Sequence, residues 1–222
     1  MAPTLAERYQ AVKAGLRPGV TLVAVSKTRT MDEIRALYEL GQRDFGENYP
    51  QELREKAPQL PDDIRWHFIG HLQRSNVKHV VPVAHLIHGV DSLRLAEEID
   101  KRAATAGRVL DILLQVHIAQ EETKHGLSPA ELRDAIGNWP WAGWAHLRPR
   151  GLMGMASNTE DRDQVRREFE GLKQLFDTVA AANTHPPGPF DTLSLGMSGD
   201  AELAQAAGST LVRIGTALFG PR

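Results

Sequence analysis

Short apolar segments alternate with helical segments from one end of this sequence to the other. Each helical segment separates two segments that have the composition of buried strands. This alternation is typical of βα units and predicts a parallel sheet with helices packed on it. The strand candidates lie at residues 22–27, 43–48, 65–70, 85–90, 111–116, 147–155, 191–195 and 210–214.

Units of this number close naturally into a (β/α)₈ TIM barrel, which is the fold that we predict. A helix over 4–16 precedes the first strand, while the last strand leaves no room for a full helix after it. The N-terminal helix could fill that place. A doubly wound open sheet is the alternative. Because no linker or composition shift divides the chain, we predict one domain over residues 1–222.

Two of the predicted helices begin with recognisable capping signals. Thr30 precedes Glu33 at capping-box spacing, and Ser128 precedes Pro129 and Glu131. A long helix is predicted over 160–183, where apolar residues alternate spacings of four and three.

Composition narrows the classes of partner. The 26 Lys and Arg residues nearly balance the 28 Asp and Glu residues, which leaves a net charge of −2. No global field then attracts nucleic acid or an acidic membrane, so a small molecule or a protein is the expected partner. Cysteine is absent, which excludes disulfides and thiolate chemistry and favours the cytoplasm. We expect no signal peptide and no membrane-spanning segment.

Lys27 ends the first strand candidate, in which four apolar residues lead through Ser26 to this lysine. An ammonium delivered by a buried strand is desolvated, which lowers its pKa and frees the amine to act as a nucleophile. This placement points to Schiff-base chemistry. The alternative is that Lys27 caps the strand and extends its charged end to water.

The last two strand candidates lead into glycine-containing segments that carry hydroxyl groups. Ser198 and Thr216 lie beside N–H groups at predicted helix starts, as in the phosphate sites that barrels form after strands 7 and 8. Arg213 lies in an apolar run, where the alternative role is a buried ion pair. A lysine for an aldehyde and a cradle for a phosphate are together what pyridoxal 5′-phosphate (PLP) requires. Each glycine loop taken alone could be a simple turn.

Seven segments resemble the YggS/PROSC family of pyridoxal phosphate homeostasis proteins over nearly the whole chain and in the same order. They are AVSKT at 24–28, FGENY at 45–49, WHFIGHLQ at 66–73, KHGL at 124–127, RGLMGM at 150–155, LSLGMSGDAELA at 193–204 and GSTLVRIGTALFG at 208–220.

The resemblance implies a single barrel, related to the N-terminal domain of alanine racemase, that binds PLP as an aldimine on Lys27. It also implies roles for further residues around the cofactor. Asn48, His67 and Ile69 would line the ring. Arg213 would face the pyridine nitrogen. The phosphate would be held by Ser198, Gly215, Thr216 and the backbone of Met197.

One segment departs from the family pattern. The family usually continues after Leu-Gln with one residue and then Asn-Lys, whereas Gln73 is followed here by Arg74, Ser75, Asn76 and Val77 before Lys78. What this segment contributes at the pocket rim or to partners is therefore left open.

The nearest rival function is that of a PLP-dependent amino-acid racemase. Racemization by two bases needs a group on each face of the substrate, and Lys27 supplies one. In alanine racemase the second base is a tyrosine from a further domain, which we do not expect here. Tyr9 and Tyr38 occupy core-like helix positions, which leaves Tyr49 as the tyrosine near a strand end. Arg213 would also keep the ring nitrogen unprotonated and weaken it as an electron sink.

We therefore predict a non-catalytic protein that stores, buffers or delivers PLP inside the cell. PLP-dependent apoenzymes are the partners that such a role would serve, and a monomer is favoured.

The sequence gives weaker support to other functions and sites. A Schiff-base aldolase also uses a barrel lysine, although commonly on a later strand. His67 and His71 are four residues apart but straddle a strand end without a carboxylate at the expected spacing, so no metal site is predicted. Trp139, Trp141 and Trp144 are expected to pack against the core, with a protein-contact patch as the alternative.

Overall fold

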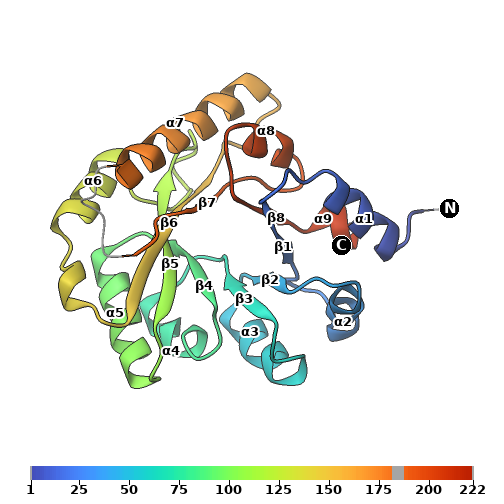
Figure 1. Cartoon of the computed structure of the whole chain (residues 1–222), viewed down its shortest axis with the longest axis horizontal. Helices are drawn as coiled ribbons and strands as arrows, with labels where there is room; N and C mark the ends of the chain where they lie inside the picture. The colour runs from blue at the N-terminus through green and yellow to red at the C-terminus, as the bar shows by residue number, and fades with distance from the viewer. Residues whose placement is uncertain (1, 182–187, 222) are drawn as a thin grey trace.

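The strands form a closed parallel barrel in which each strand pairs with its neighbours in chain order and β8 pairs with β1 (Figure 1). The structure is a computed structural model and describes residues 2–181 and 188–221. The predicted (β/α)₈ TIM barrel is therefore confirmed, and the open sheet is excluded. The strands are β1 (Thr21–Val25), β2 (Asp44–Glu47), β3 (Arg65–Phe68), β4 (Leu86–Val90), β5 (Leu110–His117), β6 (Leu147–Met155), β7 (Thr192–Ser194) and β8 (Leu211–Ile214).

Helices lie between the strands and surround the barrel (Figure 1). Both predicted capping boxes are present, with the hydroxyls of Thr30 and Ser128 accepting from the N–H groups of Glu33 and Glu131. The α-helices are α1 (Leu5–Ala14), α2 (Met31–Glu39), α3 (Pro50–Lys56), α4 (Val77–Val80), α5 (Leu93–Thr105), α6 (Pro129–Asn138), α7 (Arg162–Ala181), α8 (Ala201–Ala206) and α9 (Thr216–Phe219). Single 3₁₀ turns are η1 (Ala57–Gln59), η2 (Arg74–Asn76) and η3 (Trp141–Gly143).

The N-terminal helix occupies the place of a helix after the last strand. Helix α1 packs against the short α9, and Figure 1 shows the two side by side. Arg8 of α1 donates to the carbonyl of Leu218 at 2.5 Å and to that of Phe219 at 3.3 Å. These bonds satisfy carbonyls at the end of α9 that have no partner within so short a helix.

Boundaries differ from the predictions where turns replace regular structure. Strand β1 ends at Val25, so Lys27 lies in the turn beyond it and is half-buried. The connection between β3 and β4 contains only η2 and the single turn of α4. The helix predicted over 160–183 is α7, and residues 182–183 lie outside the described part.

Two apolar clusters hold the barrel together. The larger one fills the space between strands and helices and includes the fully buried Phe45, Phe68 and Phe169. A smaller cluster lies inside the barrel and consists of Val23, Leu86, Leu113, Met153 and Leu211. Burial of these side chains is the main stabilising contribution.

The tryptophans of the α6–β6 connection contact one another with ring centroids 5.1 to 6.2 Å apart, and they pack against the larger cluster. This agrees with the predicted packing role. Among the described residues, no helix is both long enough and apolar enough to cross a membrane.

Candidate functional site

A cavity of about 290 Å³ opens at the carboxyl ends of the strands, where barrel enzymes place their chemistry. We call it the upper cavity. The structure brings six of the predicted site residues together here, from the ends of β1, β7 and β8. Its lining consists of Val25, Lys27, Arg29, Met197, Ser198, Gly199, Arg213, Gly215 and Thr216.

The backbone on both sides of Lys27 is anchored. The Ser26 N–H donates to the Gly46 carbonyl at 2.9 Å, and the Thr28 N–H donates to Oε2 of Glu52 at 2.7 Å. Thr28 has a φ of 62°, a left-handed conformation that a β-branched residue rarely adopts. Surrounding contacts must compensate for this strain, which holds the turn in one conformation. Lys27 therefore enters the cavity from a fixed backbone.

Those anchors belong to a buried ionic cluster beneath the turn. Lys56 donates to Oε1 of Glu47 at 2.9 Å, to Glu52 at 2.6 Å and to the Ser26 carbonyl at 2.9 Å. The Ser26 hydroxyl donates to the same Glu47 oxygen at 2.6 Å. Burial raises the pKa of Glu47, and the opposing charge of Lys56 limits that rise. The cluster positions Lys27 without including it in any of these contacts.

Arg213 forms the floor of the upper cavity. Its side chain comes from β8 and is buried, with a relative exposure of 4%. It donates to the Ser194 carbonyl at 2.9 Å, to the Ser194 hydroxyl and to the Gly154 carbonyl at 3.1 Å. Burial lowers the pKa of Arg213 to about 10, so the guanidinium remains charged at neutral pH. All the acceptors described for this buried cation are neutral.

The segments after β7 and β8 meet at one wall of the cavity. The Ser198 hydroxyl accepts from the Gly215 N–H at 3.3 Å and from the Ala217 N–H at 3.4 Å. Both distances are long for such bonds, so these amides remain available to a stronger acceptor. Asp200 shapes the turn by accepting from the Met197 N–H at 2.5 Å.

The charged residues that line the upper cavity are all basic. Lys27, Arg29 and Arg213 line it, and none of its described lining residues is acidic. Arg29 also donates to the Gly220 carbonyl at 2.6 Å and lies over the ring of Phe219, which ties the C-terminal segment to the rim. The cavity therefore suits an anionic ligand with a group that reacts with an amine.

Three predicted site residues lie outside that lining. Asn48 follows β2, and its Oδ1 is buried without a hydrogen-bond partner among the described residues. Ile69 follows β3 and reaches over Gly46, where an added Cβ would lie 3.0 Å from the Ile69 Cδ1 atom. His67 lies lower, within β3 and inside the barrel. Alternation along a strand places residues 67 and 69 on one face but at different depths.

A second cavity, of about 440 Å³, opens at the opposite end of the barrel, where the strands begin. We call it the lower cavity. Its charges are paired. Arg65 binds Asp44 through two bonds of 2.8 and 2.5 Å, and Arg150 bridges Asp111 and Asp191 at 3.0 and 2.9 Å. The lining consists of Gly19, Thr21, Asp44, Arg65, His67, His85, Leu86, Asp111, Arg150, Asp191, Thr192, Thr210 and Leu211.

A buried chain of hydrogen bonds connects the two ends. From the lower end, Asp44 contacts Nε2 of His67 at 3.0 Å, and Nδ1 of His67 contacts Nε2 of His88 at 3.0 Å. Nδ1 of His88 then lies 3.0 Å from the Ser194 hydroxyl, which Arg213 also contacts. His67 therefore reaches the upper cavity through other side chains.

One arrangement of protons satisfies the whole chain. Arg213 can only donate, so the Ser194 hydroxyl accepts a hydrogen bond from it and donates one to His88. Burial lowers the pKa of His88 well below its usual value, and nearby positive charge adds to the effect, so His88 is neutral. His88 then donates to His67, which donates to Asp44. Burial raises the pKa of Asp44, but bonds from His67 and Arg65 outweigh it and bring that pKa to about 2.

Several of these residues were not predicted from the sequence. Lys56, Glu47 and Glu52 form the cluster under the turn, and only the spacing of four between Glu52 and Lys56 was a signal. Arg29 was also not predicted, and its only signal was its position two residues after Lys27. His88 and Ser194 lie within strands, where nothing in a single sequence separates them from ordinary interior positions.

Comparisons with known proteins agree on one family. The family described as alanine racemase, N-terminal domain, matches residues 2–222. The pyridoxal phosphate homeostasis protein of Vibrio alginolyticus is 38% identical over 97% of this chain and 92% of its own length. The protein of the same name from Escherichia coli K12 is 39% identical over 96% of this chain and 90% of its own.

Solved structures extend the agreement. PipY of Synechococcus elongatus PCC7942, solved with PLP bound, has a TM-score of 0.88 and 35% identity, covering 98% of this chain and all of its own. Alanine racemase from Bartonella henselae has a TM-score of 0.73 at 17% identity, and the match spans 58% of that chain. The second likeness concerns the fold alone.

Proposed function

We infer the function from family membership: this chain belongs to the pyridoxal phosphate homeostasis proteins, a group built on the N-terminal domain of alanine racemase. We propose that it binds PLP in the upper cavity, with Lys27 as the covalent attachment point, and that it stores, buffers or delivers the cofactor. The observation that carries the proposal is a cavity lined by an anchored lysine, a buried arginine and available amide N–H groups.

The residues present fit this cofactor. Asn48 offers a buried oxygen that has no described partner, and the Gly215 and Ala217 amides are bound only loosely by the Ser198 hydroxyl. Arg213 is a buried cation whose described acceptors are neutral, so an additional acceptor at the cavity floor lowers its desolvation cost. Each of these features is costly without a ligand and is relieved by one.

Each group then has an assigned role. When bound, PLP supplies an aldehyde that reacts with an amine and a ring that can withdraw electrons. Lys27 provides the amine. Ser198 and Thr216, with the amide of Gly215, would hold the phosphate, and the Met197 amide would join them by giving up its bond to Asp200. Asn48 and Ile69 would line the ring, whereas His67 would act through the hydrogen-bonded chain and not by direct contact.

Arg213 limits the chemistry of the ring. Guanidinium donates and does not accept, so a ring nitrogen that faces Arg213 must accept and stay unprotonated. An unprotonated pyridine withdraws electrons weakly. Among the described residues that line the upper cavity, Lys27 is the one with general-base chemistry. Both points support a binding protein and disfavour a racemase that uses two bases.

The proposal also covers the partners, the oligomeric state and the place of action. The partners would be PLP-dependent apoenzymes, the chain would act as a monomer, and its place of action would be the cytoplasm.

Absorbance and activity test the proposal together. Wild-type protein incubated with PLP and freed of excess cofactor should absorb in the visible range, and Lys27→Ala should not. Lys101→Ala, which removes an exposed lysine on α5, is the control and should match wild type. Neither the loaded wild type nor the loaded Lys101→Ala variant should racemize L-alanine. A colourless wild type, or racemization that depends on Lys27, would contradict the proposal.

A further inference from the structure

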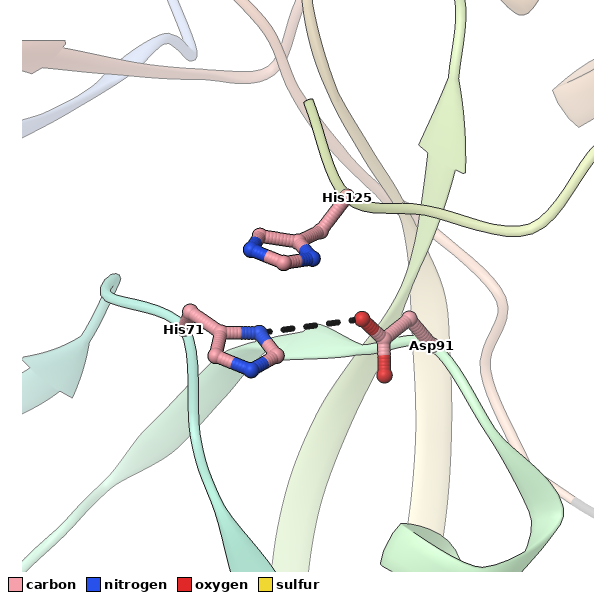
Figure 2. Close-up of side chains that lie close together, drawn as sticks. All are labelled: His71, Asp91 and His125. Carbon is pink, nitrogen blue, oxygen red and sulfur yellow. Dashed lines mark ion pairs between the residues drawn. The ribbon is translucent and has the colours of Figure 1, made fainter. Parts of the chain in front are cut away.

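His71, Asp91 and His125 converge on the rim at the carboxyl ends of the strands, away from the upper cavity. They follow the adjacent strands β3, β4 and β5, whereas the upper cavity is formed at β1, β7 and β8. One ligand atom of each residue lies within 4.8 Å of those of the other two. Figure 2 shows the imidazole of His125 above that of His71, with the Asp91 carboxylate beside them.

We propose that these three side chains bind a divalent transition-metal ion, with Zn²⁺ as the species that best matches the ligands. Two imidazoles and one carboxylate are a common protein ligand set for zinc, and such a set leaves a coordination position open to water. This proposal does not depend on PLP binding.

The separation of His71 and Asp91 is close to that of two ligands on one zinc ion. Nδ1 of His71 lies 3.8 Å from Oδ2 of Asp91. This is too long for a hydrogen bond. Two ligands at about 2.0–2.2 Å from a tetrahedral zinc ion are separated by about 3.4 Å. A shift of a few tenths of an ångström in one side chain would bring this pair to that separation.

The backbone under the site is held in place. The carbonyl of His125 accepts from the buried amide of Gln115 at 2.8 Å. Gly126 has a φ of 139°, and an added Cβ there would lie 2.5 Å from the His117 nitrogen, so the turn depends on glycine. The Leu127 N–H also bonds the Gln115 carbonyl at 2.8 Å. The ligand from the β5–α6 segment therefore starts from a fixed position.

The imidazole rings must turn to bind the ion. The rings of His71 and His125 are stacked, with centroids 3.9 Å apart and planes inclined by 15°. Nitrogen lone pairs lie in the ring plane, so nearly parallel rings cannot both point at one ion. The side chain of His71 is 41% exposed and that of His125 is exposed, so both can rotate. Metal binding should therefore break the stack.

Sequence spacing does not reveal this site. In the sequence, spacing pairs His71 with His67 as a metal-ligand candidate. His67 lies inside the barrel and contacts Asp44 and His88 instead. The carboxylate and the second imidazole come from positions 91 and 125, which only the closed barrel brings together.

Calorimetric titration of the chelator-treated full chain with Zn²⁺ at pH 7.5 tests the site. We expect one equivalent to bind, and we expect His71→Ala, Asp91→Asn and His125→Ala each to weaken binding at least about tenfold. His79→Ala changes a half-buried histidine on α4 outside the cluster and should stay within about twofold. Circular dichroism of each variant checks that the substitutions leave the fold unchanged.

Two further measurements separate this site from the proposed cofactor site. Lys27→Ala should bind Zn²⁺ as wild type does, because no cluster residue lines the upper cavity. Histidine NMR signals of His71 and His125 should shift together on metal addition, as the stack opens. Failure to bind Zn²⁺, or binding that persists in a variant lacking both histidines, would overturn the proposal and leave PLP binding untouched.

Discussion

The two ends of the barrel carry arginines in opposite circumstances. In the lower cavity, Arg65 and Arg150 are neutralised by carboxylates at hydrogen-bond distance. In the upper cavity, Arg213 is more deeply buried and contacts neutral acceptors. The lower cavity is the larger of the two, yet its charges are satisfied within the protein. The pairing of the buried arginine, and not cavity size, therefore distinguishes the end that we propose to bind PLP from the opposite end.

The hydrogen-bonded chain makes this difference a property of one connected system. Asp44 supplies a negative charge at the lower end, and His67, His88 and Ser194 carry the hydrogen bonds up to Arg213. The charged partner therefore lies at the far end of the chain from the cation. Arg213, which lines the upper cavity, therefore has no carboxylate among its described hydrogen-bond partners.

Removing one arginine from each end of the barrel tests whether the two cavities differ in their effect on PLP affinity. Arg213→Met should weaken PLP binding by about 10-fold to 100-fold, because a charge-assisted hydrogen bond contributes roughly 1.5–3 kcal/mol. Arg150→Met should leave the affinity within about twofold while lowering the melting temperature, since it leaves Asp111 and Asp191 without this partner. Equilibrium dialysis and thermal unfolding measure the two effects. Equal loss of affinity in both variants would remove the distinction.

A second prediction concerns pH at the lower end. The folded pKa of Asp44, about 2, lies below its ordinary value of 3.8. A depressed carboxyl pKa adds stability that is present above about pH 4 and is lost as pH falls toward 2. At 1.36 kcal/mol per unit, the whole contribution is roughly 2 kcal/mol.

Urea unfolding of wild type and Asp44→Asn tests this window. The stability advantage of wild type should shrink by roughly 1 kcal/mol between pH 6 and pH 3. Asn keeps an acceptor for His67, so PLP affinity at pH 7.5 should stay within about twofold. An advantage that does not change with pH would contradict the assignment of Asp44 as the charged end of the chain.

The smallest expected effect concerns Ser198 in the upper cavity. Ser198→Ala removes one neutral hydroxyl and should weaken PLP binding by about 2-fold to 10-fold, from roughly 0.5–1.5 kcal/mol per hydrogen bond. Binding of pyridoxal, which has no phosphate, should not change. Thr192→Ala, a hydroxyl variant in the lower cavity, should leave both affinities as they are. A loss of pyridoxal binding by Ser198→Ala would place that residue away from the phosphate.

Sequence patterns predicted the fold well because the regular alternation and the capping boxes are local signals. The strand order and the capping interactions of Thr30 and Ser128 follow from residues close together in the chain. The cavity lining around Lys27 was also predicted, since barrel geometry brings strand ends together.

Depth and long-range pairing could not be predicted in the same way. His67 and Ile69 share a face of β3, but only the closed barrel shows that His67 lies a layer lower. The Ser26–Glu47 hydrogen bond and the convergence of His71 with Asp91 depend on contacts between separate βα units. A single sequence contains no local trace of them.

Peptide mapping shows whether Lys27 in the upper cavity holds PLP. Wild-type protein loaded with PLP would be reduced with borohydride, digested and analysed by tandem mass spectrometry. We predict one equivalent of cofactor mass, located on Lys27. Recovery of the cofactor mass on another lysine, or no stable attachment after reduction, would contradict the account.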